Sequence, residues 1–138
     1  MQAAGDDRAL RLLERTPVPQ PHKERLFRMV HRCQELAVQA GEELQSEFGP
    51  DHVALIVGHN QFIRLFRGGP APGLVDLWLP EDAKTTMAAA GFALGEPAGQ
   101  VFKLFGWVRI DPMQGDGAAL DAAVAAAFRR ALTGGKRQ

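Results

Sequence analysis

The apolar residues of this chain change their spacing once, near Gly49 and Pro50, and this change limits the folds it can adopt. Between Pro21 and Phe48 they recur three and four positions apart, which is typical of a long helix with one buried stripe. From His52 onward, short runs rich in β-branched and aromatic residues alternate with turn residues, as in strands. The sequence therefore predicts a long helix packed against a sheet. The stripe consists of Leu26, Met29, Val30, Cys33, Leu36, Ala37, Ala40 and Leu44.

Four further segments carry the strand pattern, and three carry shorter helix patterns. The first two strands flank Gly58-His59-Asn60, which is typical of a hairpin turn. The segment from Val101 to Ile110 is long enough for one strand or for two joined at Gly106. Asp116 is expected to cap the last helix. The expected strands are 52–57, 61–67, 74–79 and 101–110, and the expected shorter helices are 7–15, 80–91 and 116–132.

This order of elements, α-α-β-β-β-α-β-α, predicts an α+β fold with a mostly antiparallel sheet and helices packed on it. A length of 138 residues favours a single domain spanning 1–138. Within it, residues 1–20 are expected to form an N-terminal arm and a proline-rich connector. The polar segment 133–138 is expected to be a frayed tail.

Charge and cysteine content narrow the expected partners and compartment. Sixteen basic residues balance sixteen acidic ones, so a nucleic acid or an anionic membrane would need a local patch to bind. The single cysteine, Cys33, rules out an intramolecular disulfide, and the first residues lack the pattern of a signal peptide. No segment approaches the ~20 apolar residues that a membrane span needs. We expect a cytoplasmic protein that does not enter membranes.

No recognised catalytic or cofactor motif is present. Ser46 is the only serine and lies outside any strand-to-helix elbow, and Cys33 belongs to the apolar stripe, where a thiol is normally inert. The four histidines lack the spacing of metal ligands, and the glycine-rich segment 68–73 lacks the Lys-Ser/Thr of a phosphate loop. The sequence therefore predicts no catalytic residue, no metal and no cofactor.

The stretch from His52 to Leu132 resembles a known group of small domains. It contains Val75-Asp76-Leu77-Trp78-Leu79-Pro80-Glu81-Asp82-Ala83 before a short helix and Gly106-Trp107-Val108-Arg109-Ile110-Asp111 before the last helix. In these features it is similar to the YjbR-like domains and to the related TfoX N-terminal domain. Most members of that group have no assigned activity, and their fold has prompted suggestions of nucleic-acid binding. The resemblance implies an α+β fold and, by analogy alone, a nucleic-acid role.

Charge is segregated along the first third of the chain. Residues 8–32 hold seven basic side chains against two acidic ones, whereas residues 33–51 hold five acidic and no basic ones. The helix from Pro21 to Phe48 would thus be basic at its start and acidic at its end, which opposes the helix dipole. Two such helices packed antiparallel would match in charge, which suggests a homodimer through this helix. The alternative is a solvated face paired with other surface charges.

Strand alternation also collects aromatic and cationic side chains on one face of the sheet. The opposite, core-facing side chains would be Val75, Leu77, Leu79, Phe102, Leu104, Val108 and Ile110. Aromatic rings beside cations suit stacking with single-stranded nucleic acid or a planar anionic ligand. The alternative is that the N-terminal helices or a partner subunit cover the rings, with the cations at the edge. The candidate binding residues are Phe62, Arg64, Trp78, Lys103, Phe105, Trp107 and Arg109, beside Phe66 and Asp76.

These observations together predict a non-enzymatic cytoplasmic binding or accessory module, with nucleic acid or a protein as its partner. A small-molecule binding protein that uses the Trp78 and Trp107 face is the second hypothesis. An enzyme of unrecognised type is the third.

Overall fold

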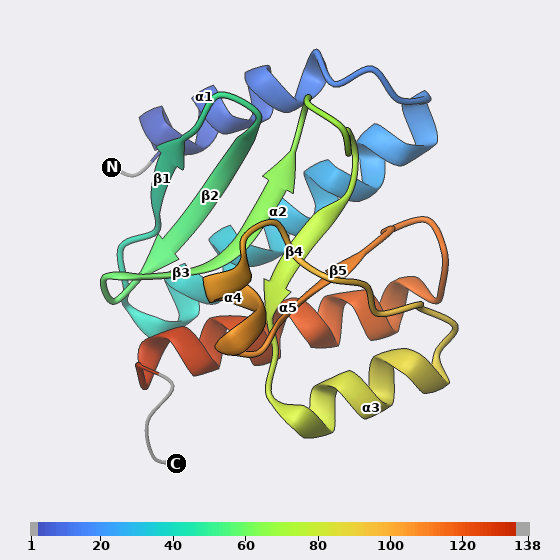
Figure 1. Cartoon of the computed structure of the whole chain (residues 1–138). Coiled ribbons are helices and arrows are strands. Elements are labelled where there is room, and N and C mark those ends of the chain that lie inside the picture. The colour runs from blue at the N-terminus through green and yellow to red at the C-terminus, as the bar shows by residue number, and fades with distance from the viewer. Residues whose placement is uncertain (1–2, 135–138) are drawn as a thin grey trace.

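The protein is an α+β domain built on a five-stranded antiparallel sheet (Figure 1). The computed structural model describes the backbone of residues 3–134 and the side chains of residues 8–134. The strands lie in the order β1-β2-β3-β4-β5, so each one pairs with its neighbours along the chain. The elements are α1 (Ala3–Glu14), α2 (Gln20–Ala40), β1 (Gln45–Phe48), β2 (His52–Val57), β3 (Asn60–Phe66), β4 (Val75–Trp78), α3 (Glu81–Ala89), α4 (Gln100–Leu104), β5 (Trp107–Ile110) and α5 (Gly117–Leu132).

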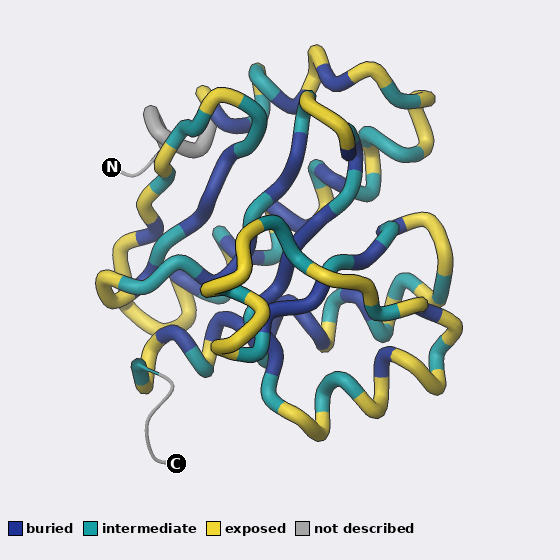
Figure 2. Tube along the Cα trace, in the orientation of Figure 1, coloured by how far each residue is buried: buried dark blue, intermediate teal, exposed yellow. Residues whose placement is uncertain are grey.

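The helices divide unequally between the two faces of the sheet. In Figure 1, α2 and α5 lie behind the sheet and α4 lies in front of it, while α3 packs against α5. One hydrophobic core lies between the sheet and the helices behind it, and Figure 2 shows the buried inner strands and helix faces in dark blue. The face of the sheet that carries α4 is called the outer face below.

Several predicted local features are confirmed. Gly58 and His59 both have positive φ angles, 59° and 71°, as the tight turn between β2 and β3 requires. The Asp116 side chain accepts a hydrogen bond from the backbone N–H of Ala119 and so caps α5.

The predicted long helix from Pro21 to Phe48 is wrong in its second part. Helix α2 ends at Ala40, because Gly41 adopts a left-handed conformation with φ 67°. The Gly41 N–H donates to the carbonyls of Ala37 and Val38 in the last turn. The chain then turns, buries Leu44 in the core and forms β1, which pairs antiparallel with β2. The apolar spacing continues past Gly41 only because Leu44 packs in the same core.

The predicted strand from Val101 to Ile110 is wrong in its first half. Gly99 and Gly106, with φ angles of 95° and 98°, bracket the short helix α4, and only residues 107–110 form β5. Phe102 and Leu104 therefore do not face the core, whereas Val108 and Ile110 do. The observed order is α-α-β-β-β-β-α-α-β-α.

Within the expected N-terminal arm at 1–20, helix α1 packs in the core. Ala9 and Leu13 of α1 are fully buried in the core, so α1 belongs to the helical layer. Of the expected frayed tail at 133–138, residues 135–138 lie outside the described residues. Between residues 3 and 134, no helix combines the length and apolar character needed to span a bilayer.

Candidate binding surface

A buried ion pair lies at the centre of the outer face. Register places Arg64, Asp76 and Arg109 side by side on β3, β4 and β5. The carboxylate of Asp76, which is fully buried, accepts hydrogen bonds from Nε of Arg109 at 2.7 Å and Nη2 of Arg109 at 3.2 Å. It also accepts a hydrogen bond from the backbone N–H of Ala98 at 2.9 Å. With its oxygens occupied in this way, Asp76 holds the segment before α4 onto the sheet.

Arg64 is enclosed by the same segment. Its Nη1 donates to the carbonyl of Ala98 at 3.2 Å, and its guanidinium carbon lies 4.3 Å from the centre of the Phe102 ring. Burial lowers the pKa of Arg64, with repulsion from Arg109 adding to the effect and attraction to Asp76 opposing it. Arg64 is therefore committed to packing rather than open to a ligand.

The two tryptophans stack on each other beneath this cover. The ring centroids of Trp78 and Trp107 are 6.4 Å apart with an interplanar angle of 11°, and the edge of Phe102 meets Trp107 at 5.0 Å. Trp107 is 6% exposed, and Nε1 of Trp78 donates to the carbonyl of Phe105 at 2.8 Å. The Trp107 ring is thus covered by the chain itself, through Phe102, rather than by the N-terminal helices, whereas the Trp78 ring stays partly exposed.

Phe62 does not lie on the outer face, so its predicted place there is wrong. Leu55 pairs with Ile63 and Ile56 pairs with Gln61, which leaves Phe62 unpaired in a β-bulge. The bulge lets Phe62 turn into the core, where it is fully buried and meets the Phe128 ring edge-on at 5.6 Å.

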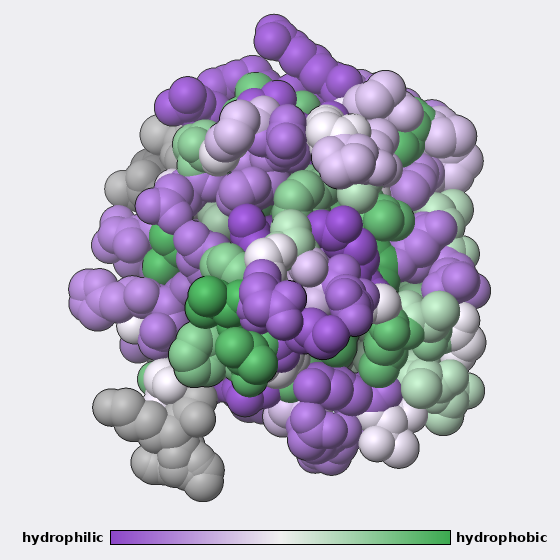
Figure 3. All heavy atoms as spheres, viewed as in Figure 1, coloured by the Kyte–Doolittle hydropathy of each residue, from purple (hydrophilic) through white to green (hydrophobic). Residues whose placement is uncertain are grey.

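Lys103 and Phe105 belong to α4 and its end rather than to a strand. Helix α4 buries none of its residues, and Val101, Leu104 and Phe105 are 59%, 76% and 62% exposed. We call these three residues the α4 patch, and Figure 3 shows hydrophobic atoms gathered where Figure 1 places α4. Such a concentration of apolar side chains on a short surface helix is typical of an interaction site.

Cationic side chains lie beside the α4 patch. Lys103 pairs with Glu96 at 2.7 Å, and the Arg130 guanidinium carbon lies 4.8 Å from the Trp78 ring centre. Nη1 of Arg130 also donates to the carbonyl of Leu79. We call the larger area the α4 surface. It comprises the α4 patch, Trp78, Lys103, Arg130 and Lys84, whose Nζ lies with the Arg130 guanidinium next to Gly106 after the end of α4.

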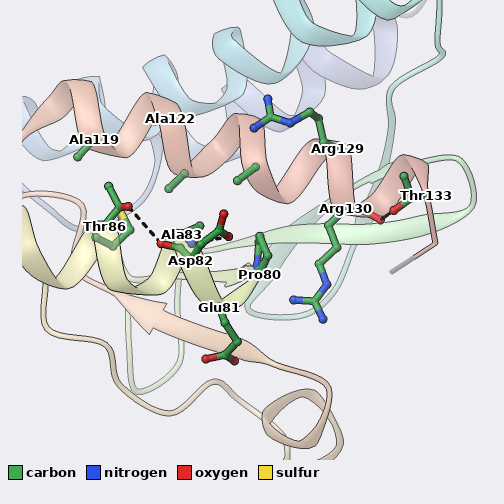
Figure 4. A pocket seen from close by; sticks show the side chains of 13 residues that line it. Pro80, Glu81, Asp82, Ala83, Thr86, Ala119, Ala122, Arg129, Arg130 and Thr133 are labelled. Atoms are coloured by element: carbon green, nitrogen blue, oxygen red, sulfur yellow. Dashed lines mark hydrogen bonds between the residues drawn. The ribbon is translucent and has the colours of Figure 1, made fainter. Parts of the chain in front are cut away.

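A groove of about 1020 Å³ lies between α3 and α5. Alanine side chains of α5 line it, including Ala119 and Ala122, with Thr86 and Asp82 on the α3 side (Figure 4). Arg130 lies at its end, so the groove meets the α4 surface there.

The cations at the start of α2 have partners within the chain. Arg28 pairs with Asp121 at 2.6 Å, Lys23 approaches Glu14 at 3.9 Å, and Arg25 donates to the carbonyl of Pro112 at 3.0 Å. Of the acidic residues expected at the end of the long helix, only Glu35 lies in α2, because the helix ends at Ala40. Three of the basic side chains behind the charge pattern thus have partners within the chain.

Sequence reasoning missed Lys84, Arg130 and the exposure of Leu104. Lys84 lies on α3 and Arg130 lies on α5. The sequence pattern of these helices indicates only that they pack against the sheet. The paired glycines around residues 100–105 were the one available signal that this run leaves the sheet.

Comparisons with protein-family models, with curated proteins and with solved structures return no match for this chain. Within the described part of the chain, no group of three or more His, Cys, Asp or Glu side chains is placed to hold a metal ion.

Proposed function

We propose that the protein is a non-enzymatic binding module that takes single-stranded nucleic acid on the α4 surface. The observation that carries this proposal is the α4 patch, which holds Leu104 and Phe105 in solvent among cationic side chains. The exposed Phe105 ring offers stacking to an unpaired base, and the aliphatic side chains beside it offer apolar contact. Neighbouring Lys and Arg offer contacts to phosphates. This combination suits a single strand better than a duplex, whose bases are already stacked.

The test is the affinity for a short labelled single-stranded oligonucleotide, measured by fluorescence anisotropy. The double variant Leu104→Ser/Phe105→Ser is expected to weaken binding about tenfold or more, since stacking contributes ~1–3 kcal/mol per base. Binding of the unmodified protein should also weaken between about 50 mM and about 200 mM salt, because phosphate contacts release counterions.

The matched control is Met113→Ser/Leu132→Ser, which removes two apolar side chains that are 41% and 37% exposed elsewhere on the surface. This control should bind as the unmodified protein does. Equal losses in both double variants, or no binding at low salt, would contradict the proposal.

A small-molecule binding protein is the second candidate, and the volume of the α3–α5 groove favours it. The groove suits a small ligand better than the Trp78 and Trp107 face, because Trp107 is covered. Substituting Ala122→Phe would fill the groove, so ligand binding that is salt-independent and lost in this variant would support the second candidate over the first.

We also propose a cytoplasmic place for the module and retain the relationship to YjbR-like domains as a hypothesis. The burial of the single cysteine, Cys33, is compatible with a reducing compartment. The α+β architecture agrees with what the resemblance implies, and fold alone carries no function.

Homodimerisation through the helix at 21–48 remains a prediction, now restricted to the exposed side of α2. Val38 offers an exposed apolar contact there, while Arg28 is already paired within the chain. Sedimentation velocity at low and high salt checks it: a dimer that Val38→Asp dissociates would support it, and a monomer at both salt concentrations would contradict it.

A further inference from the structure

Two cationic side chains of the α4 surface converge above Gly106. A Cβ atom built on this glycine would lie 3.4 Å from Nη1 and 3.6 Å from Nη2 of Arg130, and 3.7 Å from Nζ of Lys84. Gly106 has a φ of 98° and no side chain, so no Cβ lies between these nitrogens and the backbone. A ligand oxygen in van der Waals contact with Gly106 would lie outside the Cβ position and next to both cations, where small movements would let it accept hydrogen bonds from them.

Arg130 is held in place by the fold and keeps capacity for a ligand. Arg130 is fixed by its bond from Nη1 to the Leu79 carbonyl and by the Trp78 ring beneath it. Within the described part of the chain, its Nη2 forms no hydrogen bond. Preorganised donors of this kind lose little freedom when they bind an anion.

The acidic side chain that now contacts this pair is a weak competitor. Lys84 Nζ donates to Glu81 at 2.9 Å, but the Glu81 side chain is 90% exposed whereas that of Lys84 is 19% exposed. An exposed carboxylate on a mobile stem contributes little to an ion pair in water. An incoming oxyanion could therefore displace Glu81 from Lys84 at low cost.

We propose that Lys84 and Arg130 form a phosphoryl-binding subsite above Gly106, with Trp78 as its floor. Two cations that face one point favour an anion with several oxygens and more than one acceptor direction, which a phosphoryl group supplies. A phosphate of the bound strand would occupy this subsite while the bases contact the α4 patch. The identity of the ligand as a strand phosphate rests on the proposed function.

Inorganic phosphate is the probe, and the Trp78 indole N–H is the reporter. The chain has only two tryptophans, so a nitrogen–proton NMR spectrum shows two indole signals, which Trp107→Phe assigns. Phosphate at constant ionic strength should shift the Trp78 signal saturably. Lys84→Gln should weaken phosphate binding about fivefold, and Glu81→Gln should strengthen it about threefold by removing the competitor.

Arg32 and Glu35 provide the matched controls, because they form an ion pair between residues three apart on one helix, as Lys84 and Glu81 do, and lie outside the α4 surface. Arg32→Gln and Glu35→Gln should leave phosphate affinity unchanged. The absence of a saturable Trp78 shift, or equal effects of the two glutamate variants, would overturn the subsite even if the oligonucleotide still binds.

Titration of Glu81→Gln with the oligonucleotide distinguishes failure of the phosphoryl subsite from failure of the proposed function. If Glu81→Gln strengthens both phosphate and oligonucleotide binding, the subsite holds a strand phosphate. If it strengthens phosphate binding and no oligonucleotide binds, the subsite stands for a small phosphorylated ligand and the proposed function falls.

Discussion

At the scale of single residues, Asp76 is buried on a face of the sheet that strand alternation predicts to be exposed to solvent. It lies at the centre of the outer face, yet it is fully buried because Arg109 and the Ala98 peptide occupy its oxygens. Alternation predicted its side of the sheet, but not the segment that covers it.

Replacing Asp76→Asn is expected to destabilise the protein by about 3 kcal/mol, because Arg109 loses its charged partner in a buried setting. Urea unfolding at neutral pH measures the change. The control is Asp121→Asn, which removes the partner of the exposed Arg28 and should cost much less. Similar losses in the two variants would contradict the structural role of Asp76.

His52 supplies a pH-dependent prediction. Burial lowers the pKa of His52 below its ordinary value of 6.5, and the nearby Arg64 adds to the effect. Since the folded state binds the proton less readily than the unfolded state, stability is full above about pH 6.5 and falls as the pH drops toward the lowered pKa.

His52→Phe keeps a ring against Phe66, whose centroid lies 5.3 Å from that of His52, and removes the titration. The free energy of unfolding should therefore fall less in this variant than in the unmodified protein between about pH 7.5 and about pH 5.5. An equal fall in both proteins, measured by urea unfolding, would show that His52 does not carry the effect.

At the scale of elements, the ends of α2 and α4 depend on glycines more than on apolar spacing. The stripe that predicted a helix to Phe48 remained periodic because Leu44 packs in the same core after the turn at Gly41. The run from Val101 to Phe105 fits both a strand and a helix, and five residues are too few to separate the two periods. Packing of Phe102 on Arg64 and Trp107 decides the outcome.

Gly41→Ala should destabilise the protein by about 1 kcal/mol, because a non-glycine residue at φ 67° is strained even though no atom lies within 4 Å of the added Cβ. The control is Gly117→Ala in the first turn of α5, where φ is not positive and alanine favours the helix. Chemical denaturation that shows no loss for Gly41→Ala would contradict the capping role.

At the scale of the whole molecule, the α+β class and the antiparallel pairing were predictable because hairpins and amphipathic helices are local patterns. The candidate site was predictable only in part. Strand register brings Arg64, Trp78 and Arg109 together, but the covering segment and the cations from α3 and α5 come from distant parts of the chain. No local sequence pattern indicates such contacts. The sequence therefore predicted a binding surface on the sheet, whereas the exposed apolar surface in the structure lies on α4.

An NMR footprint tests whether the molecule binds its partner on the α4 surface. Backbone amide signals are recorded during titration with a short single-stranded oligonucleotide at low salt. We expect the largest changes in residues 100–106 and at Lys84 and Arg130. Changes confined to the exposed side of α2, or to β1 and β2 on the outer face, would contradict it.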